Sequence, residues 1–288
     1  GETGRKALTA GLIWLVLLAL YVLALPQQFA DPFVRSDDWP AVFPAPEFYF
    51  VKTLTEGRWL NWVWMLRGWP TEPVTLQWLF AAFWALAAAL VGVGVAPGRG
   101  QWPFAAFVAA AFALTPQQAY FSLWYATLLP AMAVLAVHAG VVVFCSTRMA
   151  ERALLAVVPA LLMMHSALPL LALTLAAALS READGWRGGL RLAVLFVLGL
   201  GAGLLAIHML NWLVHGHFGI VVAQWRETRP VEGVATLLAN AALAAEALWG
   251  AAFGAVGRIP VIAVPAFAAL VTAAVVLRSE EHTSELQS

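Results

Sequence analysis

The chain has 288 residues, of which 62% are hydrophobic and 11% are charged, whereas a soluble domain carries roughly 25% charged residues. Its 16 basic and 16 acidic residues give no net charge, so the charge balance does not suggest a nucleic-acid-binding protein. With a mean hydropathy of +0.81, the composition is that of an integral membrane protein. The single cysteine, Cys145, excludes an internal disulfide.

A membrane-spanning helix needs about 20 apolar residues, because the hydrocarbon core is about 30 Å thick and a helix rises about 1.5 Å per residue. We therefore expect an all-α polytopic bundle of about nine spans. The first apolar run is longer than the core of a signal peptide, so we expect it to be retained. The expected spans are 7–25, 75–95, 102–116, 122–145, 152–164, 167–179, 189–213, 235–256 and 260–277.

The fifth and sixth spans could instead be one long helix, 154–179, kinked at Pro169. Basic residues favour the cytoplasmic side of a membrane. Their distribution therefore helps to decide between two separate spans and one kinked helix. With the N-terminus inside, every inner loop carries basic residues if the two spans are separate. The long outer loop 26–74 breaks the trend with Arg35, Lys52, Arg58 and Arg67, and long loops are only weakly constrained by charge. We therefore predict separate spans and a cytoplasmic N-terminus. The inner basic residues are Arg5, Lys6, Arg99, Arg148, Arg152, Arg181, Arg187, Arg191 and Arg258.

The first outer loop, 26–74, carries the pair Asp37-Asp38 early in its course. Adjacent carboxylates beside a membrane indicate a site in a chain with so few acids, although a solvated loop or a helix cap before Trp39-Pro40 is the alternative. A proline-punctuated apolar stretch, 43–50, follows. Residues 51–67 then predict a helix with a bend at Gly57.

Four tryptophans crowd the second half of this loop, and tryptophan prefers the headgroup level of a bilayer. The segment is therefore expected to lie along the membrane surface as one or two interfacial helices. An ordinary aromatic belt is the alternative for each residue taken singly. The tryptophans are Trp59, Trp62, Trp64 and Trp69.

An initial helix, an outer loop that opens with an acidic pair, and interfacial helices together resemble the GT-C glycosyltransferases. The run 52–60, Lys-Thr-Leu-Thr-Glu-Gly-Arg-Trp-Leu, is similar to an element of the bacterial O-antigen glucosyltransferase branch. The resemblance covers residues 1–95 and is only topological beyond. It implies an enzyme of the bacterial inner membrane that moves a sugar from a polyprenyl-phosphate donor to a glycan or lipid acceptor on the outer face.

The resemblance implies that one of Asp37 and Asp38 is the base that accepts the acceptor's hydroxyl proton. Asp38 is slightly preferred, and repulsion between neighbouring carboxylates can raise one pKa. Cations would bind the leaving phosphate, with lipid headgroup contact as the alternative. The candidates for phosphate or substrate binding are Lys52, Arg58, Arg226, Arg229, Trp39 and His165.

Metal sites receive little support from the sequence. His215-Gly-His217 supplies at most half a coordination sphere, and no Cys or Glu lies at a matching spacing. We therefore predict no zinc site. A divalent cation on Asp37 and Asp38 stays open, because some enzymes of this architecture use one and others do not.

Glu246 and His208 fall within predicted spans, and ionisable groups there favour a functional role. They support an alternative, an ion-coupled transporter or lipid flippase that uses Glu246. Against it, corresponding halves show no pair of Gly- or Pro-broken helices. A third reading is a non-catalytic membrane subunit whose outer loop binds a partner.

The C-terminal tail, 278–288, resembles the in-frame translation of a short-read sequencing adapter. We expect the biological sequence to stop near Leu277, within a C-terminally truncated domain that spans 1–277. The tail is left out of the functional interpretation. Residue 1 is Gly rather than Met, so we also expect a truncated or trimmed N-terminus.

Overall fold

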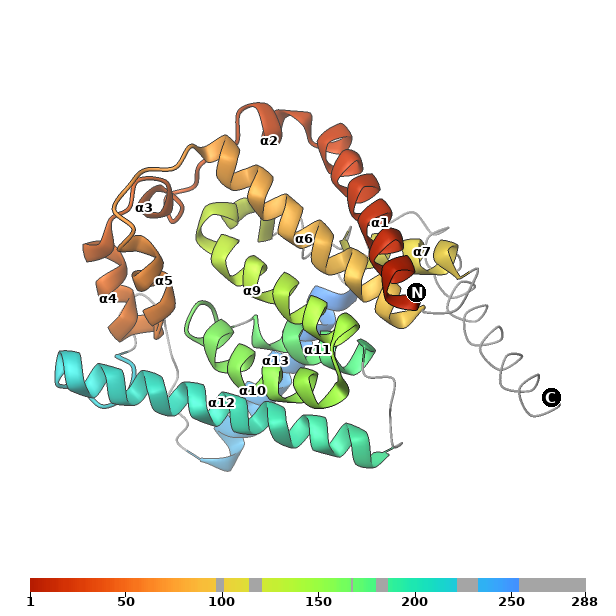
Figure 1. Ribbon diagram of the computed structural model, residues 1–288. Coiled ribbons are helices and arrows are strands. Elements are labelled where there is room, and N and C mark those ends of the chain that lie inside the picture. Colours follow the sequence, from red (N-terminus) through yellow and green to blue (C-terminus); the bar gives the residue numbers. More distant parts are fainter. Residues whose placement is uncertain (97–100, 114–120, 167, 180–185, 222–232, 254–288) are drawn as a thin grey trace. The chain divides into compact units, whose positions relative to one another are not determined.

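The computed structural model describes residues 1–96, 101–113, 121–166, 168–179, 186–221 and 233–253 (Figure 1). Every regular element in these ranges is helical, as the sequence predicts. The chain divides into two units, Gly1–Arg226 and Glu227–Ser288. The second unit contains one described helix, α13 (Val234–Phe253), on which Glu246 is exposed.

Within the described residues, four helices are long and apolar enough to cross a membrane: α1 (Glu2–Ala24), α6 (Pro73–Val95), the continuous run Ser122–Phe144, and α12 (Trp186–His215). The run Ser122–Phe144 comprises the short helix η1 (Ser122–Trp124) and α9 (Tyr125–Phe144). These helices support a membrane protein. The expected nine spans are not confirmed, and the ninth, 260–277, lies outside the described residues.

Three further helices of the first unit are shorter than a straight crossing requires: α7 (Trp102–Ala113), α10 (Thr147–Leu162) and α11 (Pro169–Leu179). At about 1.5 Å per residue, the described residues of α7 and α11 reach little more than half of a core about 30 Å thick. The spans expected from the sequence at these places, 102–116, 152–164 and 167–179, are likewise short.

The helices α10 and α11 are separate and pack against each other. The alternative of one kinked helix over 154–179 is therefore wrong. Pro169 is the first residue of α11 rather than a kink, a position where its missing N–H costs no hydrogen bond. The turn between them lies against the outer loop, because Leu60 N donates to Met163 O at 3.2 Å and Asn61 Nδ2 to Met164 O at 3.1 Å.

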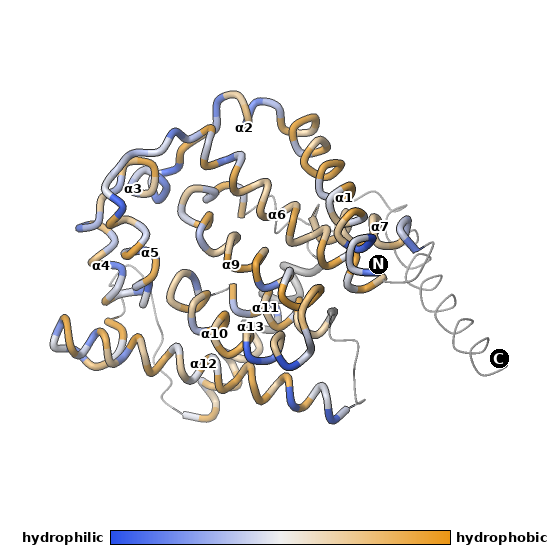
Figure 2. The backbone as a smooth tube through the Cα atoms, viewed as in Figure 1, coloured by the Kyte–Doolittle hydropathy of each residue, from blue (hydrophilic) through white to orange (hydrophobic). Residues whose placement is uncertain are grey.

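The core of the first unit forms where α6 packs against α1, α7 and α9. Small residues allow close approach, and a Cβ at Gly92 would lie 2.2 Å from Ala105 O of α7. Figure 2 shows hydrophobic residues along α1, α6 and α9, and more hydrophilic ones around α2 and α3. This arrangement supports the first outer loop at one end of the long helices.

The outer loop folds into four short helices: α2 (Pro26–Ala30), α3 (Trp39–Val42), α4 (Pro46–Glu56) and α5 (Trp59–Met65). The predicted bend at Gly57 is confirmed, since Gly57 ends α4 in the left-handed conformation with φ of 71°. The predicted helical segment begins earlier than residue 51. Pro46 starts α4 within the proline-punctuated stretch, because proline suits the first turn of a helix.

Candidate functional site

Asp38 lies at the N-terminus of α9 and is fully buried, with 0% of its surface exposed. Its Oδ1 accepts a hydrogen bond of 2.9 Å from the backbone N–H of Thr127, the third residue of α9. A carboxylate in this position satisfies a free helix N–H and faces the positive end of the helix dipole. The sequence alternative of a helix cap is thus realised, but on α9 and not on α3.

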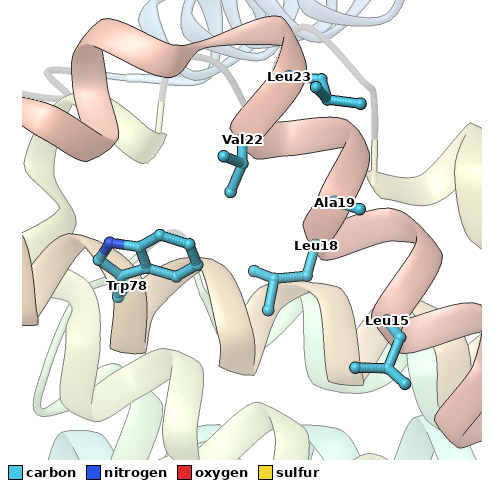
Figure 3. A pocket seen from close by; sticks show the side chains of 6 residues that line it. All are labelled: Leu15, Leu18, Ala19, Val22, Leu23 and Trp78. Atoms are coloured by element: carbon cyan, nitrogen blue, oxygen red, sulfur yellow. The ribbon is translucent and has the colours of Figure 1, made fainter.

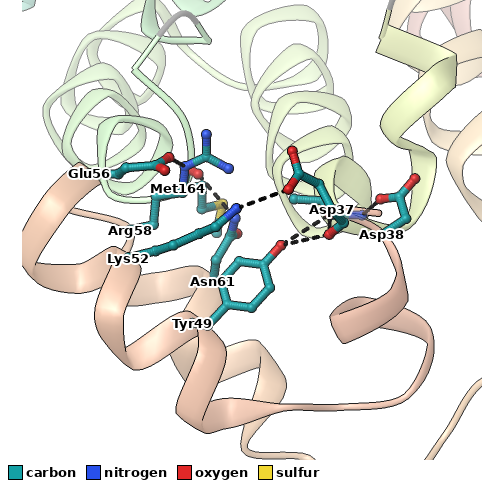
Figure 4. A network of polar contacts seen from close by, with 9 residues as sticks. Asp37, Asp38, Tyr49, Lys52, Glu56, Arg58, Asn61 and Met164 are labelled. Atoms are coloured by element: carbon teal, nitrogen blue, oxygen red, sulfur yellow. Dashed lines mark hydrogen bonds and ion pairs between the residues drawn. The ribbon is translucent and has the colours of Figure 1, made fainter. Parts of the chain in front are cut away.

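Thr127 connects the acidic pair to α4, and Figure 4 shows Tyr49 and Lys52 of α4 beside Asp37. Its Oγ1 donates to the backbone carbonyl of Asp37 at 3.1 Å. The Tyr49 hydroxyl lies 3.1 Å from the same Oγ1 and 3.4 Å from the Asp37 carbonyl. The acidic loop, α4 and α9 therefore share one buried hydrogen-bond network.

Burial raises the pKa of Asp38 to about 6. The hydrogen bonds from Thr127 and the charge of Arg35 oppose this shift, whereas the Asp37 carboxylate adds to it. Its second oxygen, Oδ2, is buried and has no hydrogen-bond partner among the described residues. This carboxyl group therefore exchanges its proton close to neutral pH.

Asp37 is the accessible member of the pair, with 53% of its side chain exposed. Its Oδ1 lies 3.5 Å from Lys52 Nζ, whose side chain is only 13% exposed. That ammonium also sits 4.9 Å from the ring centre of Phe48 and 5.3 Å from that of Tyr49. Burial first and the charge of Arg58 second lower the pKa of Lys52. The exposed Asp37 carboxylate therefore lies beside the largely buried ammonium group of Lys52.

Arg58 directly precedes α5 as its N-cap residue. Its Nε lies 2.7 Å from Glu56 Oε2. Trp39 is 51% exposed and stacks on Phe43 with ring centres 5.4 Å apart. His165 lies in the α10–α11 turn, directly after the residues that bond α5. Two further predicted residues, Arg226 and Arg229, lie outside the described residues.

Two apolar cavities are found away from the acids. One, of about 420 Å³, lies between α1 and Trp78 of α6 (Figure 3). The other, of about 320 Å³, lies between α9 and α10. Neither is lined by Asp37 or Asp38, so neither is the cavity that the enzyme reading would require.

Two of the histidines singled out by sequence have hydrogen-bond partners. His215 Nε2 lies 2.8 Å from Thr53 Oγ1, and His208 Nδ1 lies 2.7 Å from the Leu204 carbonyl of its own helix. Among the described residues, no group of three or more His, Cys, Asp or Glu side chains could hold a metal ion.

Sequence reasoning missed the polar residues that organise the site. Thr127, Tyr49 and Thr53 carry no recognisable motif, and their roles depend on contacts between distant segments. Asn211 is different, because it is an amide within an apolar helix. That signal could have singled it out, since polar groups in membrane helices usually bond to another element.

Comparison with known proteins finds no family model, no curated protein and no solved structure that matches this chain. The functional argument therefore depends on the geometry of the site.

Proposed function

We propose that the chain is a membrane glycosyltransferase of the GT-C type, which moves a sugar from a polyprenyl-phosphate donor to a glycan or lipid acceptor. The observation that carries this proposal is the exposed Asp37 carboxylate beside Lys52, with Arg58 close enough to act on the pKa of that lysine. Glycosyl transfer needs a carboxylate for the acceptor and positive charge for the leaving phosphate. Both are present at one end of the candidate spans.

The geometry favours different roles for the two acids. Asp37 reaches solvent and accepts the acceptor's hydroxyl proton as the new glycosidic bond forms. The bond from the sugar to the phosphate oxygen breaks, and the charge that remains on the phosphate is stabilised by Lys52 and Arg58. Asp38 is buried against α9, so it holds the loop and does not touch the acceptor. This assignment reverses the slight preference from sequence for Asp38.

A divalent cation on the acidic pair does not fit the side chains. Asp37 already faces Lys52 Nζ, and one Asp38 oxygen accepts the Thr127 N–H. No third carboxylate or histidine completes a group in the described part of the chain. No step of the proposed reaction passes through a metal.

The test is transfer of a radiolabelled sugar from a polyprenyl-phosphate donor to acceptors in membranes that contain the full chain. We expect Asp37→Asn to lower the rate at least about 100-fold, the scale of a lost general base. Asp38→Asn should retain most of the activity, because an amide oxygen can still accept the Thr127 N–H. Asp31→Asn is the matched control, since Asp31 is exposed in the same loop.

Full activity of both Asp37→Asn and Asp38→Asn at normal protein abundance would refute the proposed glycosyltransferase activity. Glu246→Gln tests the alternative of an ion-coupled transporter or flippase. That reading requires loss of function in Glu246→Gln and none in the aspartate variants.

A further inference from the structure

The end of the first unit opposite the acidic pair carries arginines on two adjacent helices. Arg148 and Arg152 are exposed on α10, and Arg187 and Arg191 are exposed on α12. Each pair is spaced by four residues, which places its members on one face of a helix. Glu151 Oε1 binds Arg191 Nη2 at 2.7 Å and joins the two helices.

The two helices run parallel in this region. The ion pair joins the fifth residue of α10 to the sixth residue of α12. Further along, Gly199 of α12 packs against Val158 of α10, where an added Cβ would lie 2.9 Å from the valine Cβ. The same register, continued one turn toward both N-termini, places Arg148 beside Arg187. In the described ranges, Glu151 is the carboxylate that neutralises one arginine of this group, which leaves three positive charges.

This arrangement works against helix stability. Arg148 and Arg187 are the second residues of their helices, and neither helix has an acid in its first turn. The helix dipole disfavours cations there, and like charges four residues apart repel. Sequences usually break such local rules at functional sites. An external anion would supply the missing counter-charge.

The position of these arginines on the molecule indicates the class of anion that they would bind. Trp186 is 74% exposed, and the Arg187 guanidinium lies 5.7 Å from its ring centre. Tryptophan marks the headgroup level, and the hydrophilic start of α12 leads into a strongly apolar helix (Figure 2). We infer that Arg148, Arg152 and Arg187 bind the phosphate groups of anionic phospholipids at the bilayer surface.

The experiment compares binding of phosphatidylglycerol and phosphatidylcholine to the detergent-solubilised full chain by native mass spectrometry. We expect a clear preference for phosphatidylglycerol. The double variant Arg148→Gln/Arg187→Gln should lower phosphatidylglycerol affinity about fivefold for each arginine removed, the scale of one cation near an anionic surface. Phosphatidylcholine binding should not change, which shows that the variant is folded. Lys6→Gln is the control, since Lys6 is already paired with Glu2 at 2.8 Å.

Equal binding of the two lipids by the unmodified chain would overturn the inference. An unchanged preference in the double variant would overturn it as well. Displacement of phosphatidylglycerol by inorganic phosphate at equal concentration would identify a free phosphate site instead. Each outcome is independent of sugar transfer, so it leaves the proposed function untouched.

Discussion

At the scale of single residues, Asp38 combines two opposed effects. Burial disfavours its charged form, whereas the N–H of Thr127 and the α9 dipole favour that form. Burial prevails, since the pKa rises from its ordinary value of 3.8 to about 6. Ionised Asp38 therefore destabilises the folded protein at neutral pH.

The sign of the resulting pH dependence follows from linkage. Between pH about 4 and about 6 the folded state binds more protons at Asp38 than the unfolded state does, so stability falls as the pH rises through this window. A shift from 3.8 to about 6 corresponds to about 3 kcal/mol. We expect Asp38→Asn to flatten this part of the profile and to be at least as stable at pH 7. Thermal unfolding in detergent between pH 4 and 8 measures the stability of the unmodified chain and of Asp38→Asn.

Asp38→Leu is the companion variant, because it removes the charge together with the cap on α9. Loss of a helix cap costs about 1 kcal/mol, so this variant should be less stable than Asp38→Asn at every pH. Profiles of equal slope in the unmodified chain and in Asp38→Asn would show that Asp38 does not titrate in this window.

The sequence could identify the acidic pair but not the roles of its members. Asp37 and Asp38 are adjacent and chemically identical, and a chain so poor in acids draws attention to both. Their difference depends on Thr127, which is 89 residues away from Asp38. No local pattern predicts such a contact, because it depends on the packing of α9 against the loop.

At the scale of elements, α12 holds α4 and α5 in place. Trp59 Nε1 donates to Asn211 Oδ1 at 2.9 Å, and Asn211 Nδ2 donates to Gly219 O at 2.6 Å. At the α4–α5 bend, a Cβ on Gly57 would lie 2.9 Å from Ile207 Cδ1. Because α4 carries Lys52 and Tyr49, the order of the site depends on this contact.

Asn211→Leu should loosen these two helices. The substitution leaves the buried Trp59 N–H and the Gly219 carbonyl unpaired, at a cost of about 1–3 kcal/mol for each group. We expect faster amide hydrogen exchange in α4 and α5, with α6 and α9 unchanged. Met209→Leu is the control, because Met209 is exposed on the same helix. Unaltered exchange in α4 and α5 would show that α12 does not hold them.

At the scale of the whole molecule, hydropathy predicts where the apolar helices lie. The expected spans 7–25, 75–95, 122–145 and 189–213 correspond to long apolar helices whose bounds differ by a few residues. The shorter expected spans, 102–116 and 167–179, contain α7 and α11, of which 12 and 11 residues are described. Helix length depends on caps and turns as well as on apolar content, and Pro169 begins a helix where the sequence also allowed a kink.

The lone cysteine allows the membrane crossing of α9 to be tested. Cys145 is exposed directly after α9, whose 20 residues span about 30 Å, and the opposite end of α9 contacts Asp38. We expect a membrane-impermeant maleimide to label Cys145 from inside the cell. Ser36→Cys in a Cys145→Ser background should be labelled from outside. Ser166→Cys should behave like Ser36→Cys, because the α10–α11 turn bonds to α5.

Each labelling pattern has a distinct meaning. If Cys145 and Ser36→Cys react from the same side, α9 does not cross the membrane, and the acidic pair shares a surface with the arginines of α10 and α12. If Cys145 is labelled from outside and Ser36→Cys from inside, α9 still crosses the membrane, but the prediction of a cytoplasmic N-terminus is wrong. Charge predicts the first orientation, since the arginines near Cys145 favour the cytoplasmic side. Only that orientation exposes Asp37 to an acceptor on the outer face.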